Sequence, residues 1–139
     1  MIPARFDYAA PTSLEEALGL LEANQNAKIL AGGHGLLRDM KLRCLSPAML
    51  VDLRRIQDLR GIGHDDGGIQ IGAMATLAEI AGDKSVQDDF PALVEAIRDI
   101  GDPQDVNVGT IGGGLANVGA PSGLPAVALA TEATIKARG

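Results

Sequence analysis

A chain of 139 residues is the size of one domain and can bury most of its unfolded surface around a single core. Its net charge of −6, with no run of lysine or arginine interleaved with aromatic residues, argues against a nucleic-acid-binding surface. Cys44 is the only cysteine, which excludes an internal disulfide and a cysteine-cluster metal site within this chain.

The first part of the chain predicts a helix between two short strands. Residues 12–25, TSLEEALGLLEANQ, begin with two overlapping capping boxes and repeat leucine and alanine at helical spacing, so we expect an amphipathic helix. AKIL at 27–30 predicts a short buried strand that runs into the glycine-rich stretch AGGHG at 31–35. LLRDMKLR at 36–43 has a helical or turn-like pattern, and MLVDL at 49–53 predicts a second strand.

The middle of the chain predicts a hairpin followed by helices. Residues 59–75 alternate around the turn Asp65-Asp66-Gly67-Gly68, as the two strands of a hairpin do. TLAEIAG at 76–82 predicts a short helix. Residues 86–100 predict a longer one, whose regular part begins near Pro91 because proline is tolerated in a first helical turn.

The last part contains the second glycine-rich stretch, GTIGGGLAN at 109–117, which we interpret as a loop. LPAVALATE at 124–132 then predicts a helix, and ATIKA at 133–137 predicts a strand. Helices and strands mixed in this order indicate an α+β fold.

Two glycine-rich stretches in one short chain are consistent with a phosphate site. Glycine lets the backbone approach phosphate oxygens and adopt positive φ, so that successive N–H groups converge on a diphosphate without basic side chains. Thr110 would add a hydroxyl donor. Neither stretch has the lysine of a P-loop or a complete G-x-G-x-x-G. The alternative is that these glycines serve tight turns or close packing.

No catalytic or metal-binding constellation stands out. His34 and His64 are the only histidines, too few for a metal site in a chain with one cysteine. The paired acids at 65–66 and 88–89 are explained by a turn and by a helix terminus. A nucleophile elbow of the form G-x-S-x-G is missing from the sequence.

Five segments in unbroken order from Phe6 to Gly139 resemble a known family. They are FDYAAPTSLEEALGLL, AKILAGGHGLLRDMKLR, LVDLRRIQDLRGI, GGIQIGAMATLAEI and IGDPQDVNVGTIGGGLANVGAPSGLPA. This chain is similar to the FAD-binding medium subunit of molybdenum hydroxylases, which include carbon monoxide dehydrogenase and xanthine dehydrogenase. The pair of AGGH and TIGG blocks at this separation carries most of the resemblance.

The resemblance implies an FAD-binding domain of the vanillyl-alcohol-oxidase (PCMH) type, with FAD between two small subdomains at 1–54 and 55–139, the second incomplete at its C-terminus. It implies electron transfer from FAD to an acceptor, with a molybdenum cofactor-binding large subunit and a [2Fe-2S] small subunit as partners. No catalytic side chain or metal ligand is implied. The implied cofactor-binding residues are Ile29, Leu30, Ala31, Gly32, Gly33, His34, Gly35, Leu36, Ile100, Thr110, Ile111, Gly112, Gly113 and Gly114.

Three positions depart from the family's usual residues. Val106 stands where Arg is usual, Gly114 where Ser or Asn is usual, and Gly123 where Asp is usual. These departures leave open a cofactor-free remnant or interaction module of the same fold. A stand-alone mononucleotide-binding domain is a further alternative, although the missing P-loop lysine argues against it. With no signal-peptide pattern and no stretch of membrane-spanning length, we expect a cytoplasmic protein.

Overall fold

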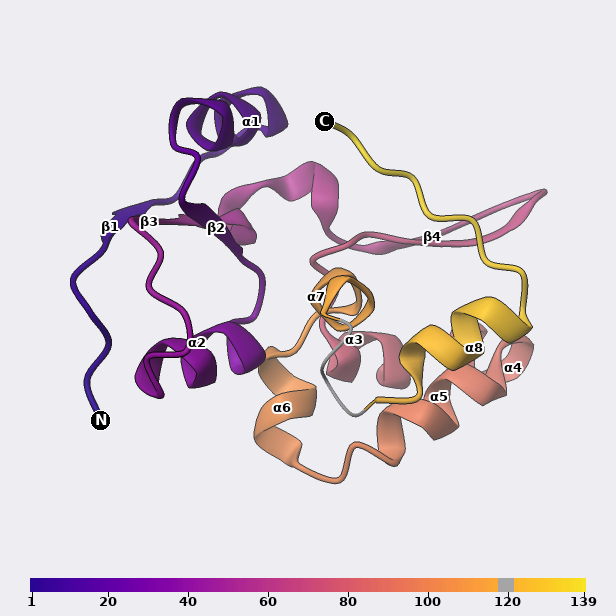
Figure 1. The fold of residues 1–139 in the computed structure, drawn as a ribbon. Coiled ribbons are helices and arrows are strands. Elements are labelled where there is room, and N and C mark those ends of the chain that lie inside the picture. The colour runs from indigo at the N-terminus through magenta and orange to yellow at the C-terminus, as the bar shows by residue number, and fades with distance from the viewer. Residues whose placement is uncertain (118–121) are drawn as a thin grey trace.

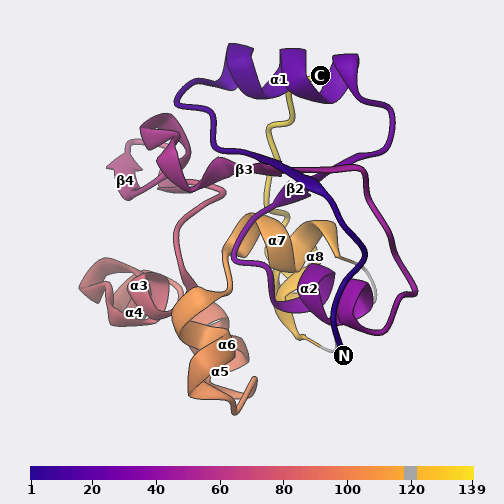
Figure 2. The ribbon, with the colours of Figure 1, turned by 90° about the vertical axis from the view of Figure 1, so that its left-hand side faces the viewer.

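The first part of the molecule is a small parallel sheet between two helices. A computed structural model describes residues 1–117 and 122–139. Strands β1 (Asp7–Ala9), β3 (Met49–Asp52) and β2 (Ala27–Leu30) form a three-stranded parallel sheet in the order β1-β3-β2. Helix α1 (Leu14–Ala23) lies over one face of this sheet and α2 (His34–Lys41) over the other (Figures 1 and 2). The chain passes from β1 to β2 through α1 and from β2 to β3 through α2, because parallel strands need crossover connections of this kind.

The central strand β3 joins two hydrophobic clusters because its side chains alternate between the faces of the sheet. Val51 packs with Ala17 and Ile56 on the α1 side. Leu50 packs with buried residues of β2 and α2 on the other side. The strand predicted at 27–30 is confirmed, but its predicted burial is wrong: β2 is an edge strand, and Ile29 is 48% exposed.

A buried carboxylate terminates β3. Asp52 is 1% exposed and accepts a hydrogen bond from the Tyr8 hydroxyl at 2.7 Å and from the backbone N–H of Arg54 at 2.9 Å. The Arg54 guanidinium lies 2.6 Å from the same carboxylate. The hydrogen bond to Asp52, helped by desolvation, raises the pKa of Tyr8. These three partners satisfy a charge that would otherwise be costly to bury.

The second part of the molecule consists of a hairpin and six short helices within the described residues. Strands β4 (Ile62–Asp65) and β5 (Gly68–Ile71) pair in antiparallel fashion around a turn at Asp66 and Gly67, as the sequence predicts. Ile80, Val86, Ile97 and other buried residues form the main core, against which the isoleucines of the hairpin pack. The helices are α3 (Leu77–Gly82), α4 (Lys84–Asp89), α5 (Pro91–Arg98), α6 (Pro103–Val108), α7 (Ile111–Ala116) and α8 (Leu124–Ala130).

Most of the α-helices in both parts of the molecule begin next to a residue whose side chain caps them. Ser13 accepts the N–H of Glu16 at the start of α1, while the Glu16 carboxylate accepts the N–H of Thr12. Thr76 and Glu79 form a complete capping box at the start of α3. Such caps satisfy N–H groups that have no partner within the helix, and they explain why the predicted helices at 12–25 and 76–82 are confirmed.

The regular helix expected from about Pro91 is confirmed as α5, which begins at Pro91. Residues 86–89 belong to the separate helix α4, because Pro91 lacks an N–H and disfavours a helical conformation at Phe90. The structure differs from the sequence-based expectations in two elements. The stretch 109–117 is not a loop: Thr110 caps a helix whose glycines pack too tightly for side chains. Residues 133–137 pair with no strand in the described part of the chain, so the strand predicted there is wrong.

Candidate functional site

The two glycine-rich stretches, far apart in the sequence, lie against each other where α2 begins (Figure 1). A Cβ placed on Gly32 would overlap the carbonyl oxygen of Val108 at the end of α6. A Cβ placed on Gly113 would lie 3.0 Å from the carbonyl oxygen of Ala31. Glycine is therefore needed at position 32 for the two backbones to approach this closely, and at position 113 a side chain would be tightly packed.

Two side-chain contacts also connect the first glycine-rich stretch to later residues, one to α6 and one to the end of the second glycine-rich stretch. The Nδ1 atom of His34 lies 2.5 Å from a carboxylate oxygen of Asp105 in α6. The side-chain amide of Asn117 lies over Gly35 in the first turn of α2 and occupies the space that a Cβ of Gly35 would take. No local pattern of the sequence identifies Asp105, Val108 or Asn117 as contact residues, because their partners lie at 32–35.

The start of α2 presents backbone N–H groups without an internal cap. Gly32 and Gly33 have φ values of 73° and 91°, which turn the chain sharply from β2 into the helix. Gly33 is the N-cap, and no side chain caps this helix. Leu37 is the first residue to donate back into the turn, at 2.9 Å to the Gly33 carbonyl. The N–H groups of residues 34–36 therefore precede the first intrahelical bond, the position at which a helix binds anions.

The start of α7 differs, because its N–H groups already have acceptors. Ile111 donates to the carbonyl of Ala75 at 3.1 Å, and Gly112 donates to the carbonyl of Ala73 at 2.9 Å. Gly113 donates to the Thr110 hydroxyl oxygen at 3.2 Å. For Gly112 and Gly113 to bind a diphosphate through their N–H groups, as the sequence-based hypothesis requires, these bonds would have to be shared or exchanged. That role stays a prediction.

Among the α-helices of residues 1–117 and 122–139, α2 alone begins with neither a capping side chain nor a proline. Ser13, Thr76, Asp83, Asp102 and Thr110 cap α1, α3, α4, α6 and α7. Helices α5 and α8 have proline within their first two positions, which removes an N–H donor. The first glycine-rich stretch is thus the place where the described chain can best hold an anion.

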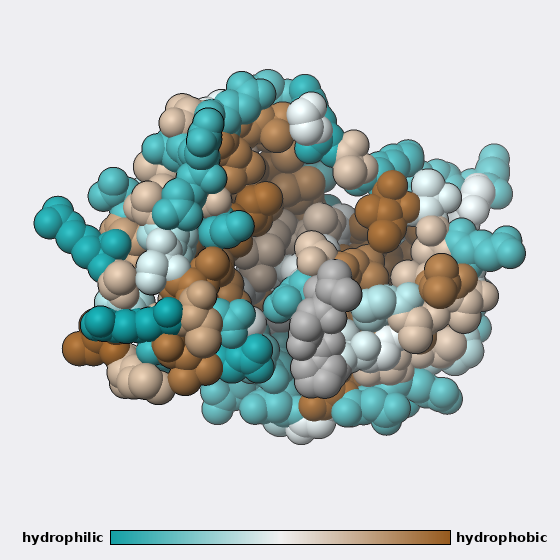
Figure 3. All heavy atoms as spheres, in the orientation of Figure 1, coloured by the Kyte–Doolittle hydropathy of each residue, from teal (hydrophilic) through white to brown (hydrophobic). Residues whose placement is uncertain are grey.

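An apolar hollow adjoins this place. Figure 3 shows it between the part of the molecule that holds α1 and β2 and the part that holds α7 and α8. Ile29 is half exposed on the edge strand β2, whereas Leu30 is buried and Leu36 packs beside it. Ile29, Leu30 and Leu36 therefore differ in exposure, and only Ile29 offers a large apolar surface to a ligand.

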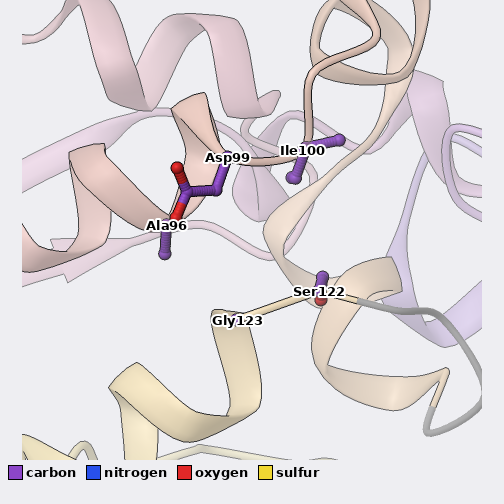
Figure 4. Close-up of a pocket in the computed structure, with 5 residues that line it drawn as sticks. All are labelled: Ala96, Asp99, Ile100, Ser122 and Gly123. Atoms are coloured by element: carbon purple, nitrogen blue, oxygen red, sulfur yellow. The ribbon is translucent and has the colours of Figure 1, made fainter.

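Ile100 belongs to a different hollow, beside α5 and α8 (Figure 4). This hollow has a volume of about 380 Å³ and is also lined by Ala96, Asp99, Ser122 and Gly123. The Ser122 hydroxyl is buried there without a hydrogen-bond partner among the described residues. Val106 packs against the main core, and Gly114 lies against Leu124. The structure thus brings together the two glycine-rich stretches and leaves Ile100 in separate surroundings.

The described ranges contain neither a cluster of metal-ligating side chains nor a membrane-spanning helix. Nowhere in them do three potential metal-ligating side chains gather. None of their helices has the length and apolar character needed to cross a bilayer. The uncapped start of α2 and the adjoining apolar hollow are the features of the described chain that best suit a bound ligand.

Known proteins share this sequence and fold. Residues 4–139 match a family described as the FAD binding domain in molybdopterin dehydrogenase. The carbon monoxide dehydrogenase medium chain of Hydrogenophaga pseudoflava is 46% identical over 134 residues, which are 96% of this chain and 47% of that protein. The glyceraldehyde dehydrogenase medium chain of Sulfolobus acidocaldarius is 40% identical over 135 residues, which are 97% of this chain and 48% of that protein.

A solved structure of carbon monoxide dehydrogenase from Hydrogenophaga pseudoflava, which lacks the Mo-pyranopterin moiety of its cofactor, has a TM-score of 0.81 and 48% identity to this chain. The match covers 84% of this chain and 41% of that chain. The chain thus spans about half the length of the curated relatives it matches. The resemblance and the α+β class inferred from the sequence are confirmed, and the chain belongs to the family of FAD-binding domains of molybdopterin dehydrogenases.

Proposed function

We propose that this chain forms part of the electron-transfer subunit of a molybdenum-containing hydroxylase or dehydrogenase. When bound, FAD supplies the redox chemistry, and the protein binds and orients it. In this proposal a molybdenum-containing large subunit would oxidise the substrate and a [2Fe-2S] small subunit would relay the electrons to this subunit, where bound FAD would supply the transfer to an acceptor. The names of the relatives and the family membership support this assignment.

The start of α2 carries the proposal, because its geometry suits the FAD diphosphate. The N–H groups of residues 34–36 precede the first intrahelical bond, and the positive φ values of Gly32 and Gly33 turn the chain so that these groups lie at the start of the helix. Ile29 would then contact an apolar part of the cofactor. Thr110 keeps a hydroxyl hydrogen to donate, since its oxygen is the acceptor for Gly113.

We infer that FAD lies in the hollow between two subdomains, residues 1–54 and 55–139, of a PCMH-type fold. The hydrophobic clusters support this division: two are built largely around the parallel sheet and its helices, and the third joins the hairpin to the later helices. A cytoplasmic location remains a prediction from the sequence.

Substitution of Gly33 tests the proposal. Gly33 has a φ of 91°, and a Cβ there would lie 2.9 Å from the Leu30 side chain and 3.1 Å from the Leu37 side chain. Gly33→Val should strain the turn by about 1–3 kcal/mol and displace the N–H groups of residues 34–36 that the proposal assigns to the diphosphate. We expect purified Gly33→Val to contain little flavin by visible absorption, whereas the wild type binds it.

Gly61→Val is the matched control, since Gly61 has a φ of 90° and open space around it. It should carry similar backbone strain and keep its flavin. Gly112→Val would be a poorer probe, because its Cβ would lie 2.7 Å from the Ala73 carbonyl oxygen and disturb folding itself. Calorimetric titration of the wild type with FAD, ADP and ATP completes the test. Preference for ATP would overturn the assignment, and binding of none of the three would favour a cofactor-free module.

A further inference from the structure

His34 and Asp105 form the one charged contact recorded between the first glycine-rich stretch and α6 within the described chain. The imidazole belongs to the first residue of α2, and the carboxylate lies in the first turn of α6. The side chains of His34 and Asp105 are 52% and 23% exposed, so the pair lies at the edge of the contact and not in a dry core. An ion pair forms when the imidazole is protonated.

Asp105 is held firmly from its own side. Its carbonyl accepts the N–H of Gly109 at 2.7 Å, and Asp102 caps the same helix through the N–H of Gln104 at 2.8 Å. A backbone fixed in this way gives the His34 ring a partner at a defined position.

The other charged side chains of α2 and α6 do not compete for this contact. Arg38 lies beside Asp39 at 3.3 Å on α2, Lys41 lies in the last turn of α2 at the end opposite His34, and the carboxylate of Asp102 caps the start of α6. With Nδ1 directed at Asp105, the Nε2 atom is the ring nitrogen left for another partner.

We propose that Asp105 is a positioning residue, which through His34 holds the uncapped start of α2 against α6 and thereby increases the affinity of this turn for the FAD diphosphate. This inference rests on the proposed function. The contact orients the imidazole, compensates the carboxylate and keeps the N–H groups of residues 34–36 in place before the cofactor arrives. Preorganisation of this kind raises affinity because less conformational freedom is lost on binding.

The test compares FAD dissociation constants, measured by calorimetry on the full chain, for the wild type, Asp105→Asn, Asp105→Ala, His34→Ala and the double variant. Asp105→Ala and His34→Ala should each weaken FAD binding about tenfold, and the double variant should be no weaker than either. Asp105→Asn keeps the shape of the side chain, so it should weaken binding with little change in melting temperature. Asp89→Asn removes an exposed carboxylate of α4 and should bind FAD like the wild type.

A spectroscopic signal separates positioning from a general effect on folding. The ¹⁵N resonance of His34 Nδ1 should move in Asp105→Asn and stay in place in Asp89→Asn, in both cases without cofactor. If the wild type binds FAD and Asp105→Asn and Asp105→Ala bind it equally well, the inference is wrong and the proposed function stands. Additive losses in the double variant, or an unchanged His34 resonance, would also overturn it. If the wild type itself binds no FAD, the proposed function fails first.

Discussion

Asp52 shows how one residue can hold the end of a strand. The sequence places it at the end of an apolar run, where burial of a charge is unfavourable unless the charge has partners. Its partners come from both sides along the chain: Tyr8 from β1, and the N–H and guanidinium of Arg54 from the turn that follows. The carboxylate thereby ties β1 to β3 and fixes the start of the turn.

Replacement of Asp52 should therefore destabilise the sheet. Asp52→Ala leaves the Tyr8 hydroxyl and the Arg54 N–H without this acceptor, and we expect the free energy of unfolding to fall by about 1–3 kcal/mol. Urea denaturation monitored by circular dichroism measures the change. Asp58→Ala, at an exposed carboxylate in the 3₁₀ helix at Gln57–Leu59, should stay within about 0.5 kcal/mol of the wild type. Equal losses in both variants would show that the Asp52 contacts do not stabilise the fold.

At the scale of elements, N-caps decide where the short helices begin. Helices of six residues, such as α3 and α7, are too short to be stable alone and depend on caps and packing. The capping box of α3 has a measurable electrostatic signature. The N–H of Thr76, and secondarily its hydroxyl, donate to the Glu79 carboxylate and lower the pKa of Glu79.

This shift predicts a loss of stability in acid. Because the pKa of Glu79 is lower in the folded than in the unfolded state, its contribution is present above the ordinary value of 4.5 and is lost as the pH falls through the folded value. The carboxylate is exposed, so the contribution should be less than about 1 kcal/mol. Glu79→Gln keeps a capping side chain without this titration, and its melting temperature should fall less than that of the wild type between about pH 5 and pH 3.

Glu95→Gln provides the control for this prediction, because Glu95 is an exposed carboxylate of α5 outside any capping box. Its melting temperature should show the same acid-induced fall as that of the wild type. If Glu79→Gln and Glu95→Gln follow the wild-type curve equally, the charged form of Glu79 adds nothing to the cap.

At the scale of the whole molecule, the contact between the glycine-rich stretches joins the sheet to the later helices. Gly32 fits against the carbonyl of Val108, and Gly113 fits against the carbonyl of Ala31. The same glycines therefore serve close packing as well as the proposed cofactor site. The two interpretations left open by the sequence are compatible in this structure.

Gly32→Ala should weaken this contact. Its Cβ would overlap the Val108 carbonyl oxygen, and its φ of 73° is unfavourable for a side chain. Backbone strain alone costs about 1–3 kcal/mol, and the overlap should add to it. Gly61→Ala is the matched control, since it imposes a comparable φ of 90° in open space. Chemical denaturation should show a larger loss for Gly32→Ala. Equal losses would mean that the contact with Val108 yields without cost.

Local patterns sufficed for most helices and strands but not for their surroundings. The capping residues, the apolar spacing of 12–25 and the turn at Asp66 and Gly67 act over a few neighbouring residues, and the structure confirms the elements that they predict. Burial of 27–30 and pairing of 133–137 depend on which strands lie alongside, and both expectations were wrong. The loop expected at 109–117 was also wrong, because the helix there depends on close packing of its glycines against distant residues.

The sequence by itself determined the α+β class, the order of most elements and the family, because periodicity, caps and the paired glycine motifs are properties of the chain itself. Only the tertiary structure decided that the first stretch begins an uncapped helix while the N–H groups of the second are already bonded. Only it paired His34 with Asp105. Hydrogen bonds and ion pairs between distant segments depend on how the backbone folds through space, and no local rule of sequence contains that information.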